Sequence, residues 1–487
     1  MKKITIDPIT RLEGHGKIEI FLNDEGDVNN VYFQVPELRG FEKFIEGRPA
    51  EEVPHIVTKI CGVCPGCHHM ASGKAVDMAF GVEPTPTAKM LREFFYMVHF
   101  VHSHIAHFYA LAAPDFVVGP TAPKAERNIL GVIAKVGAEI GTEVIKQRRI
   151  AQEIQALLGG HQTHVMLNMP GGVRKGLTEE QRLDMISKSE GFVEFSKFSL
   201  KVFEDIVLSN KNYVDIILKG PYKLDLYSMG LVDENNNVNF YDGKVRVVDQ
   251  DGVEHCKYSP TEYREFIAER IEPWSYLKFP YLKKIGWKGF EDGKDSGVYH
   301  ATPLSRLNAS DGMATPLAQE EYERMYSTLG GKPVHNTMAM HWARLIELLY
   351  SSERALELAR NDIIAGKELR TPIERITGEG VGIVEAQRGT LTHHYWTDQK
   401  GIITKANIIV GTTNNNAAIC MSIKKAAQGF IKKGTIIDDG VLNLIEMAFR
   451  AYDPCFSCAT HSLPGKMPMI VCLRDAKGNL LRSVSRD

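Results

Sequence analysis

Two cysteine pairs at opposite ends of the chain constrain its fold more than any other feature. The first pair is Cys61 and Cys64, the second is Cys455 and Cys458, and each has the spacing Cys-x-x-Cys. Two intervening residues let the backbone turn back, so each pair can place two sulfurs on one metal. The pairs are 391 positions apart (455 − 64). The sequence therefore predicts that folding brings four thiolates from both ends of the chain into one pocket.

The cysteine usage favours metal chemistry over a disulfide framework. The chain has eight cysteines in 487 residues, and four of them form these two pairs. In a reducing compartment such pairs indicate metal binding or redox chemistry. His68 and His461 follow the two pairs closely, which strengthens the metal interpretation. Two kinds of site fit the residues: a structural zinc site that holds the chain ends together, or a catalytic nickel and iron site.

Composition excludes several other classes of function. Hydrophobic residues make up 44% and charged residues 24%, as in an ordinary soluble globular protein. With 58 basic and 60 acidic residues the net charge is −2, so we expect neither a nucleic-acid partner nor an anionic membrane surface. The N-terminus has no apolar signal core, and no apolar run reaches transmembrane length. We expect a cytoplasmic protein, although a partner subunit could carry an export signal for both.

The hydrophobic pattern predicts an α+β fold that is mainly α. Long segments with helical periodicity cover residues 86–113, 124–158, 179–209 and 337–366. Their apolar stripes must be buried against one another, which predicts a core bundle of long helices. Shorter helical patterns precede the second cysteine pair at 415–431 and 438–451.

Antiparallel β elements are expected at the periphery of this bundle. Short alternating segments occur at 3–6, 15–22 and 28–36. A β-rich insertion is expected at about 221–258, where turn residues separate short apolar runs. Residues 375–412 are glycine-rich and then strand-like. The run Gly378-x-Gly380-x-Gly382 lacks the spacing of a dinucleotide-binding loop, so we expect no dinucleotide there.

Five motifs together resemble the large subunits of nickel–iron hydrogenases. They are the two cysteine motifs at 59–65 and 453–461, together with Asp-Pro-Ile-Thr-Arg-Leu-Glu-Gly-His at 7–15, Arg-Gly-Phe-Glu at 39–42 and Glu-Ala-Gln-Arg-Gly at 385–389. They occur in the family's order, and the resemblance spans nearly the whole chain. The compact length and the Cys-Ala-Thr-His-Ser ending are similar to the cytoplasmic, cofactor-coupled group, which includes NAD-reducing and methyl-viologen-reducing enzymes.

The resemblance implies a role for each cysteine. By carry-over, Cys61 and Cys455 bind nickel alone, whereas Cys64 and Cys458 bridge nickel to iron. In the family the iron also carries cyanide and carbon monoxide, and the centre oxidises dihydrogen reversibly to two protons and two electrons. Two alternatives stay open: a non-catalytic hydrogenase-like scaffold, whose known relatives in respiratory NADH dehydrogenases lack the cysteines, and a zinc-stabilised assembly subunit.

Further residues match catalytic positions of the family. Glu13 matches the proton-relay glutamate near the nickel thiolates; its alternative role is a surface carboxyl that caps a turn. Arg388 matches an arginine held over the metals, where it could pair with a carboxylate such as Asp115. Asp115 could equally be a helix-end turn residue. Gln387 stands where the family has proline.

The resemblance also implies a second metal and an outer hydrogen bond. Glu42 and His461 match ligands of a magnesium or iron ion, with a backbone carbonyl near Asn416 as a third. His68 is expected to hydrogen-bond a bridging sulfur, with a plain packed histidine as the alternative. Cys67 is expected to be a small buried thiol and not a fifth ligand.

The C-terminal residues have a meaning in the family as well. The resemblance implies one catalytic unit over 1–461 and an extension, 462–487, that a dedicated protease removes after His461. The alternative is a permanent β-hairpin formed by the alternating residues around 469–481.

Electron transfer requires other subunits. The paired cysteines are used at one site, which leaves no four-thiolate set for an iron–sulfur relay. The resemblance implies an iron–sulfur small subunit that docks near the cysteine pairs. Beyond it we expect a flavin/NAD module or a heterodisulfide-reductase-type module, with NAD(P) or another soluble molecule as the acceptor.

Overall fold

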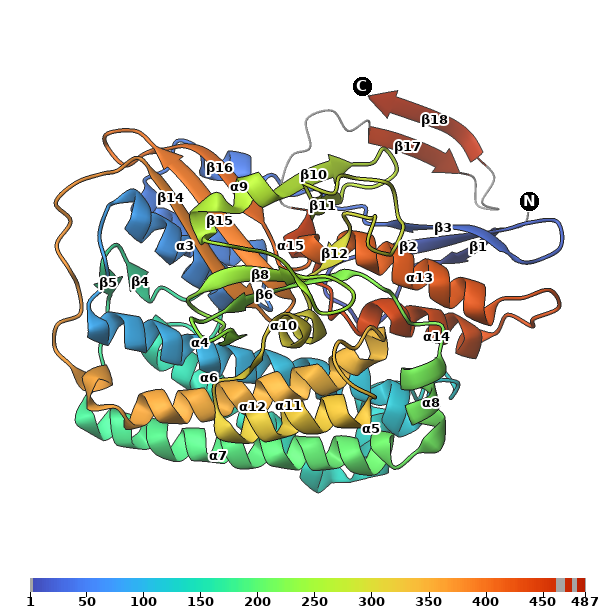
Figure 1. Cartoon of the computed structure of the whole chain (residues 1–487), viewed down its shortest axis with the longest axis horizontal. Helices are drawn as coiled ribbons and strands as arrows, with labels where there is room; N and C mark the ends of the chain where they lie inside the picture. The colour runs from blue at the N-terminus through green and yellow to red at the C-terminus, as the bar shows by residue number, and fades with distance from the viewer. Residues whose placement is uncertain (1–2, 461–468, 475–479, 487) are drawn as a thin grey trace.

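The core of the protein is a layer of long helices. The computed structural model describes residues 3–460, 469–474 and 480–486. The long helices run side by side in the lower half of Figure 1: α4 (Pro86–Ala106), α6 (Ala138–Gly159), α7 (Glu179–Phe203), α11 (Pro316–Thr328) and α12 (Met340–Arg360). Helix α12 packs against α4 and α7, and α4 packs against α6. The predicted fold, mainly α with a long-helix core, is confirmed.

The helical segments differ from the prediction mainly at their ends. The single helix expected over 124–158 is two helices, α5 (Ile129–Val136) and α6. Gly137 separates them because its φ of 96° lies in the left-handed region, which ends a right-handed helix. Helix α4 continues as π-helical turns over His107–Ala112 and Pro114–Val118.

A three-stranded antiparallel sheet lies against the helix that follows the first cysteine pair. The sheet consists of β14 (Glu379–Ala386), β15 (Gly389–Thr397) and β16 (Ile403–Ile409). Helix α3 (Pro65–Ala79) packs directly on β14 and β15. A Cβ atom at Gly380 or Gly382 would lie about 2 Å from a backbone oxygen of α3. These glycines therefore permit close helix–sheet packing.

The N-terminal sheet packs against helices from the C-terminal part of the chain. The N-terminal sheet has three antiparallel strands, β1 (Lys3–Ile6), β2 (Lys17–Leu22) and β3 (Val28–Gln34). Strand β3 packs on α13 (Asn416–Phe430), which packs on α14 (Asp439–Arg450). Figure 1 shows these blue and red elements side by side at one end of the molecule. One hydrophobic core runs continuously from β2 to the second cysteine pair.

The predicted β-rich segment is part of a larger sheet. The antiparallel strands β6 (Tyr227–Val232), β8 (Lys244–Val248) and β9 (Glu254–Tyr258) confirm a meander within 221–258. The same sheet also includes β7 (Asn237–Val238), β12 (Tyr299–His300) and β13 (Gly312–Met313). The β-rich region thus extends well beyond residue 258, and β10 (Ile267–Ile271) and β11 (Lys278–Leu282) form a further hairpin.

Shorter elements complete the described chain. They are α1 (Phe41–Ile45), α2 (Val53–Ile56), β4 (Asn168–Met169), β5 (Gly172–Val173), α8 (Lys211–Lys219), α9 (Tyr263–Phe266), α10 (Pro303–Ala309), α15 (Phe456–Ala459), β17 (Met469–Arg474) and β18 (Leu480–Arg486). Strands β17 and β18 pair antiparallel, as the predicted hairpin requires.

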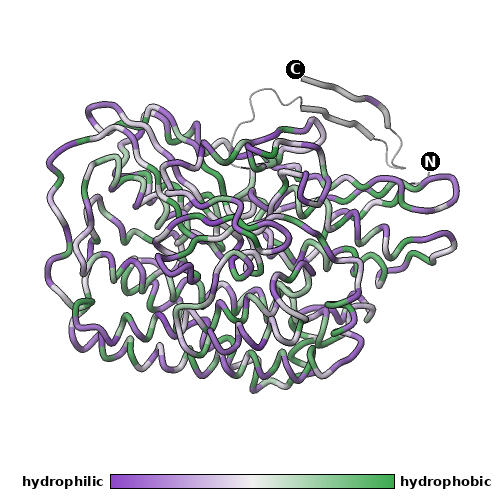
Figure 2. Tube along the Cα trace, viewed as in Figure 1, coloured by the Kyte–Doolittle hydropathy of each residue, from purple (hydrophilic) through white to green (hydrophobic). Residues whose placement is uncertain are grey.

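Hydrophilic residues colour much of the long segment between α12 and β14 at the rim of the molecule (Figure 2). None of the helices in the described part of the chain is long and apolar enough to cross a lipid bilayer.

Candidate metal centre

The four paired cysteines converge in the interior, as the sequence predicts. Their sulfur atoms all lie within 4.8 Å of one another, and all four residues are buried. The Sγ–Sγ distance is 3.2 Å between Cys61 and Cys455 and 3.4 Å between Cys64 and Cys458. Four sulfurs at this separation can share one or two metal ions, and soft thiolates suit nickel, iron and zinc.

The first pair is held at the start of a helix. Cys61 follows a 3-10 turn over Val57–Ile60, and Cys64 is the N-cap of α3. The backbone N–H groups of Val63 and Cys64 donate to the sulfur of Cys61 over 3.1 and 3.3 Å. Burial opposes ionisation of Cys61, but hydrogen bonds from the neighbouring thiols and the charge of Arg388 outweigh it and hold its pKa well below the usual value.

The second pair lies on a short helix that contacts the N-terminal loop. Cys455 is the N-cap of α15, and its backbone N–H donates to Thr412 Oγ1 over 3.1 Å. The backbone N–H of Phe456 donates to the carbonyl of Glu13 over 3.1 Å. Gly14 permits this contact, because its φ is +85° and a Cβ there would lie 2.9 Å from the backbone nitrogen of Ser457. The glycine after Glu13 is thus required by the packing.

Glu13 contacts the second pair through its side chain as well. Its carboxylate oxygen Oε2 accepts a hydrogen bond from the Cys455 thiol over 2.9 Å and one from the Ser457 N–H over 3.2 Å. Burial, followed by the charge of Cys61, raises the pKa of Glu13. A carboxyl with a raised pKa beside a thiol can take up and release a proton. A surface residue that caps a turn, the alternative, does not fit these contacts.

Arg388 reaches the cysteines, but with a different partner from the one predicted. Its Nη2 lies 2.9 Å from Oδ2 of Asp453, and its Nη1 donates to Ser103 Oγ over 3.4 Å. The predicted pairing with Asp115 is wrong. Asp115, at the end of the α4 extension, instead contacts the guanidinium groups of Arg11 and Arg450 at 2.5 and 2.7 Å.

Asp453 is a site residue that the sequence analysis missed. It stands two positions before Cys455, and its φ of 53° turns the chain between α14 and the second pair. Its carboxylate is buried against Arg388. The sequence Asp453-Pro454-Cys455 could have pointed to this role. A charged turn residue two positions before a metal ligand lies close enough to the site to pair with a cation there.

A small cavity of about 220 Å³ lies between the cysteines and the β14–β15 turn. Its walls are sulfur and apolar atoms with one cationic side chain. They are formed by Cys64, Cys67, His68, Ala386, Arg388, Leu391, Val410, Gly411, Thr412, Cys455 and Cys458. A small space of this kind, lined by three of the four paired thiols, suits small uncharged or anionic ligands on a metal.

His68 connects the cavity to a buried polar chain. Its Nε2 lies 3.5 Å from the sulfur of Cys458, and its Nδ1 lies 3.1 Å from Nε2 of His393. His393 in turn contacts the hydroxyl of Tyr395 at 2.5 Å. This geometry fits the predicted hydrogen bond to a bridging sulfur, because the second ring nitrogen is fixed by His393.

Cys67 lies in the cavity wall, outside the four-thiol group. Its sulfur donates to Oε1 of Gln387 over 3.0 Å. Burial, followed by the charge of Cys64, raises the pKa of Cys67 far above its usual value, so the group is a neutral thiol. This agrees with the predicted small buried thiol.

The residues predicted to bind a second metal are described only in part. Oε1 of Glu42 accepts a hydrogen bond from the N–H of Ile408 over 2.7 Å. The amide nitrogen of Asn416 donates to the carbonyl of Lys278 over 2.8 Å, while its Oδ1 is buried with no hydrogen-bond partner among the described residues. His461 lies outside the described residues. The chain passes close by, because the Arg39 N–H donates to the carbonyl of Thr460 over 2.7 Å.

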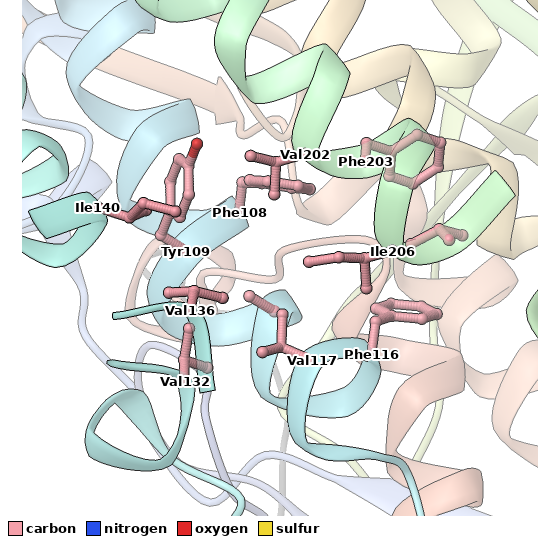
Figure 3. Close-up of a pocket in the computed structure, with 12 residues that line it drawn as sticks. Phe108, Tyr109, Phe116, Val117, Val132, Val136, Ile140, Val202, Phe203 and Ile206 are labelled. Atoms are coloured by element: carbon pink, nitrogen blue, oxygen red, sulfur yellow. The ribbon is translucent and has the colours of Figure 1, made fainter. Parts of the chain in front are cut away.

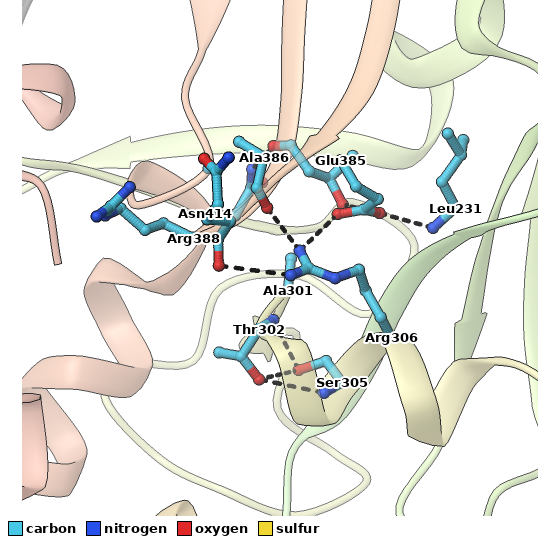
Figure 4. Close-up of polar contacts among 12 residues, drawn as sticks. Leu231, Ala301, Thr302, Ser305, Arg306, Glu385, Ala386, Arg388 and Asn414 are labelled. Carbon is cyan, nitrogen blue, oxygen red and sulfur yellow. Dashed lines mark hydrogen bonds and ion pairs between the residues drawn. The ribbon is translucent and has the colours of Figure 1, made fainter. Parts of the chain in front are cut away.

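A buried charge cluster supports the β14–β15 turn, and sequence reasoning missed it. The guanidinium of Arg306 contacts Glu347 at 2.6 Å and Glu385 at 2.9 Å, and all three side chains are fully buried. Arg306 also donates to the carbonyls of Ala386 and Gln387 over 2.8 and 3.4 Å. Figure 4 shows this guanidinium between Glu385 and the turn that carries Arg388.

Known proteins match the chain over its whole length. A family model described as nickel-dependent hydrogenase matches residues 39–140 and 141–461, and a model described as HoxL-like matches residues 3–38. The chain is 47% identical over 484 residues to an F420-non-reducing hydrogenase iron-sulfur subunit of Archaeoglobus profundus, with 99% of each protein covered. It is 36% identical over 499 residues to the NAD-reducing hydrogenase HoxS subunit beta of Cupriavidus necator, with 100% of each covered.

Solved structures agree with these matches. A crystal structure of an NAD+-reducing NiFe-hydrogenase in the H2-reduced state superposes with a TM-score of 0.89 at 35% identity, covering 95% of this chain and 100% of that chain. The Ni-Fe-Se hydrogenase from D. vulgaris Hildenborough superposes with a TM-score of 0.76 at 23% identity, over 94% of this chain and 100% of that chain, and shares the fold. The chain therefore belongs to the nickel-dependent hydrogenase family, as a catalytic large subunit of the nickel–iron type.

Proposed function

We propose that the four thiolates hold a nickel–iron centre, with Cys61 and Cys455 on nickel alone and Cys64 and Cys458 bridging nickel to iron. The observation that carries this proposal is the convergence of four buried sulfurs within 4.8 Å. When bound, the centre supplies the reversible oxidation of dihydrogen to two protons and two electrons. Metal binding would also deprotonate the thiols, which burial otherwise keeps protonated at Cys455 and Cys458.

In this proposal Glu13 is the proton acceptor and donor of the site. Its carboxylate is 2.9 Å from the sulfur of Cys455, so a proton on that sulfur needs to move only one hydrogen bond. The raised pKa of Glu13 favours a carboxyl that holds a proton and releases it again. Its partial exposure gives the proton a route onward towards the surface.

Arg388 holds a fixed positive charge over the cavity. Its ion pair with Asp453 and the hydrogen bond from Asn415 Nδ2 to its carbonyl over 2.7 Å fix its position. A buried cation beside a small cavity favours anionic ligands. This supports iron that carries cyanide as well as carbon monoxide in that space.

We extend the proposal to the C-terminal part of the chain. Glu42, His461 and a carbonyl near Asn416 would bind magnesium or iron, and a maturation protease would cut after His461 and remove residues 462–487. The contact between Arg39 and Thr460 supports this, because it brings the end of the catalytic unit, 1–461, next to the Glu42 helix.

Electrons would leave through an iron–sulfur small subunit. In the described part of the chain, the four cysteines are the one group of His, Cys, Asp or Glu side chains placed to hold a metal ion. The relatives include an NAD-reducing and an F420-non-reducing hydrogenase. We therefore propose a cytoplasmic complex in which a flavin/NAD or heterodisulfide-reductase-type module passes electrons to NAD(P) or another soluble acceptor.

Purification of the native complex tests these proposals. Metal analysis should give nickel and iron in the large subunit, and hydrogen uptake should be measured with benzyl viologen and with NAD as acceptors. Zinc without nickel in loaded protein would overturn the nickel–iron proposal and favour a zinc-stabilised assembly subunit. Metal-free protein with intact partners would favour a scaffold.

A further inference from the structure

Gln387 has a buried amide nitrogen that no described residue satisfies. The side chain is fully buried in the turn between β14 and β15. Its Oε1 accepts the hydrogen bond from the Cys67 thiol over 3.0 Å, while its Nε2 has no hydrogen-bond partner among the described residues. A buried amide with two unsatisfied N–H donors is rare in a folded protein, because its lost hydration is not replaced.

The carboxamide contacts a residue of the thiol cavity's wall. The residues on either side of Gln387, Ala386 and Arg388, both line that cavity. Cys67, which the side-chain oxygen touches, lines it as well. The Cys67 thiol has one S–H to donate, so the oxygen faces the thiol and the nitrogen takes the other end of the planar amide. The unpaired donor is thus the free end of a side chain that touches the cavity wall at Cys67.

The turn that carries Gln387 is fixed from behind. Arg306 donates to the carbonyls of Ala386 and Gln387, and Asn415 donates to the carbonyl of Arg388. These hydrogen bonds fix the backbone of the turn, so a backbone movement cannot carry the amide to another acceptor. It is oriented by Cys67 and held by the fully buried Arg306, which makes it a preorganised donor.

We infer that the Nε2–H of Gln387 donates a hydrogen bond to the nitrogen of a cyanide ligand on the iron. The inference rests on the proposed cyanide-bearing iron. A metal-bound cyanide carries negative charge on its nitrogen and is a strong acceptor, whereas the oxygen of bound carbon monoxide is a weak one. Gln387 is then a positioning residue for the iron ligands, and Cys67 positions Gln387.

Infrared spectroscopy of the purified holoenzyme tests the inference directly, because bound cyanide and carbon monoxide absorb in a region free of protein bands. The wild type and Gln387→Met should be compared, since methionine has a similar length and no N–H donor. We expect one cyanide band to move in Gln387→Met while the other cyanide band and the carbon monoxide band move much less. We also expect that band to shift between H2O and D2O in the wild type and to lose this shift in the variant.

Two further variants keep the result interpretable. Leu391→Val changes the packing of the same cavity without removing a donor and should leave the cyanide bands in place. Cys67→Ala frees the amide and should move the same band as Gln387→Met by a smaller amount. Unchanged bands in Gln387→Met, or equal shifts in Leu391→Val, would overturn the inference. A wild type without cyanide bands would instead overturn the proposed iron ligands, so the two failures are distinguishable.

Discussion

Two cavities in the same interior have opposite linings. The thiol cavity, of about 220 Å³, is bounded by three of the paired cysteines, His68 and Arg388. The second, of about 400 Å³, lies where the π-helical extension of α4 meets α5, α6 and α7, and Figure 3 shows its lining of valine, isoleucine, phenylalanine and one tyrosine. None of the residues that line the second cavity carries a charge.

Of these two cavities, only the thiol cavity has buried charged side chains among the described residues around it. Around the thiol cavity the buried ions are paired: Arg388 with Asp453, and Arg306 with Glu347 and Glu385. Well-packed apolar residues could replace such pairs with equal or greater stability. We infer that the charges at the thiol cavity serve its chemistry, whereas the apolar cavity affects stability alone. Each prediction below sharpens or breaks that distinction.

The largest effect is expected at the thiols. Cys455→Ser should lower hydrogen uptake more than about 100-fold, because even residues that only orient a metal ligand contribute 10- to 100-fold. Nickel content measured by mass spectrometry should fall with it, while circular dichroism shows a retained fold. Cys67→Ser is the matched control, since that buried thiol lies outside the four-sulfur group and should leave nickel bound. Full nickel occupancy in Cys455→Ser would contradict the assignment.

Removal of the proton acceptor should affect catalysis without loss of metal. We expect Glu13→Gln to lower hydrogen uptake by about 10²- to 10⁴-fold at unchanged nickel content, because the amide keeps the shape of the side chain but neither accepts nor releases a proton near neutral pH. Burial and the charge of Cys61 raise the pKa of Glu13. Since uptake needs the deprotonated carboxylate, wild-type activity should fall as pH drops through that raised pKa.

The pH profile and a neighbouring carboxyl provide the controls. The acidic fall in activity should be absent from the residual activity of Glu13→Gln. Glu37→Gln changes a nearby carboxyl that contacts Ser457 Oγ at 3.4 Å, and its activity should stay within about twofold of wild type. An equal loss in both variants would indicate a general disturbance of this loop and not proton transfer.

Stability should respond more strongly to the buried charge cluster than to a surface one. Arg306→Met leaves Glu347 and Glu385 buried without their cation, which should reduce the free energy of unfolding by about 3–5 kcal/mol. Arg246→Met is the matched control, because Arg246 also contacts two carboxylates, Glu254 and Asp311, but these are about half exposed. Its effect should be about 1 kcal/mol or less. Melting curves of the two variants compare them, and similar shifts would refute the argument from burial.

The smallest effect is expected in the apolar cavity. Val136→Ile adds one methylene group to its lining and should stabilise the fold by at most about 0.8 kcal/mol, with hydrogen uptake unchanged. Val245→Ile, at a fully buried position of β8, provides the contrast and should be neutral or destabilising because no gap receives the added group. A loss of hydrogen uptake in Val136→Ile at wild-type stability would break the distinction between the cavities.

Sequence reasoning predicted the parts of the molecule that depend on local patterns. The apolar stripes fixed the long helices, and the paired cysteine motifs predicted a shared pocket that the structure confirms. Gly137 was missed as a helix boundary because one glycine inside an apolar pattern is compatible with a continuous helix. Helix boundaries depend on single φ angles, which a period of 3.6 residues does not report.

Contacts between distant charges were beyond the sequence. Arg388 could have paired with any nearby carboxylate, and only the fold selects Asp453 over Asp115. One feature of the sequence indicates the Arg306 cluster. Glu347 lies among Leu345, Leu348 and Leu349 in a helix that is buried on nearly all sides. A charged residue in such a helix needs a buried partner, but its identity comes from three-dimensional packing.

The contact between Cys61 and Cys455 has a consequence for biosynthesis. The two residues are 394 positions apart. At translation rates of about 5–20 residues per second, a ribosome needs roughly 20–80 seconds to make the second sulfur available after the first. During that interval the nascent chain presents half a site, which any thiophilic ion in the cell could occupy. The four-sulfur site can therefore be completed only after the C-terminal pair has been made.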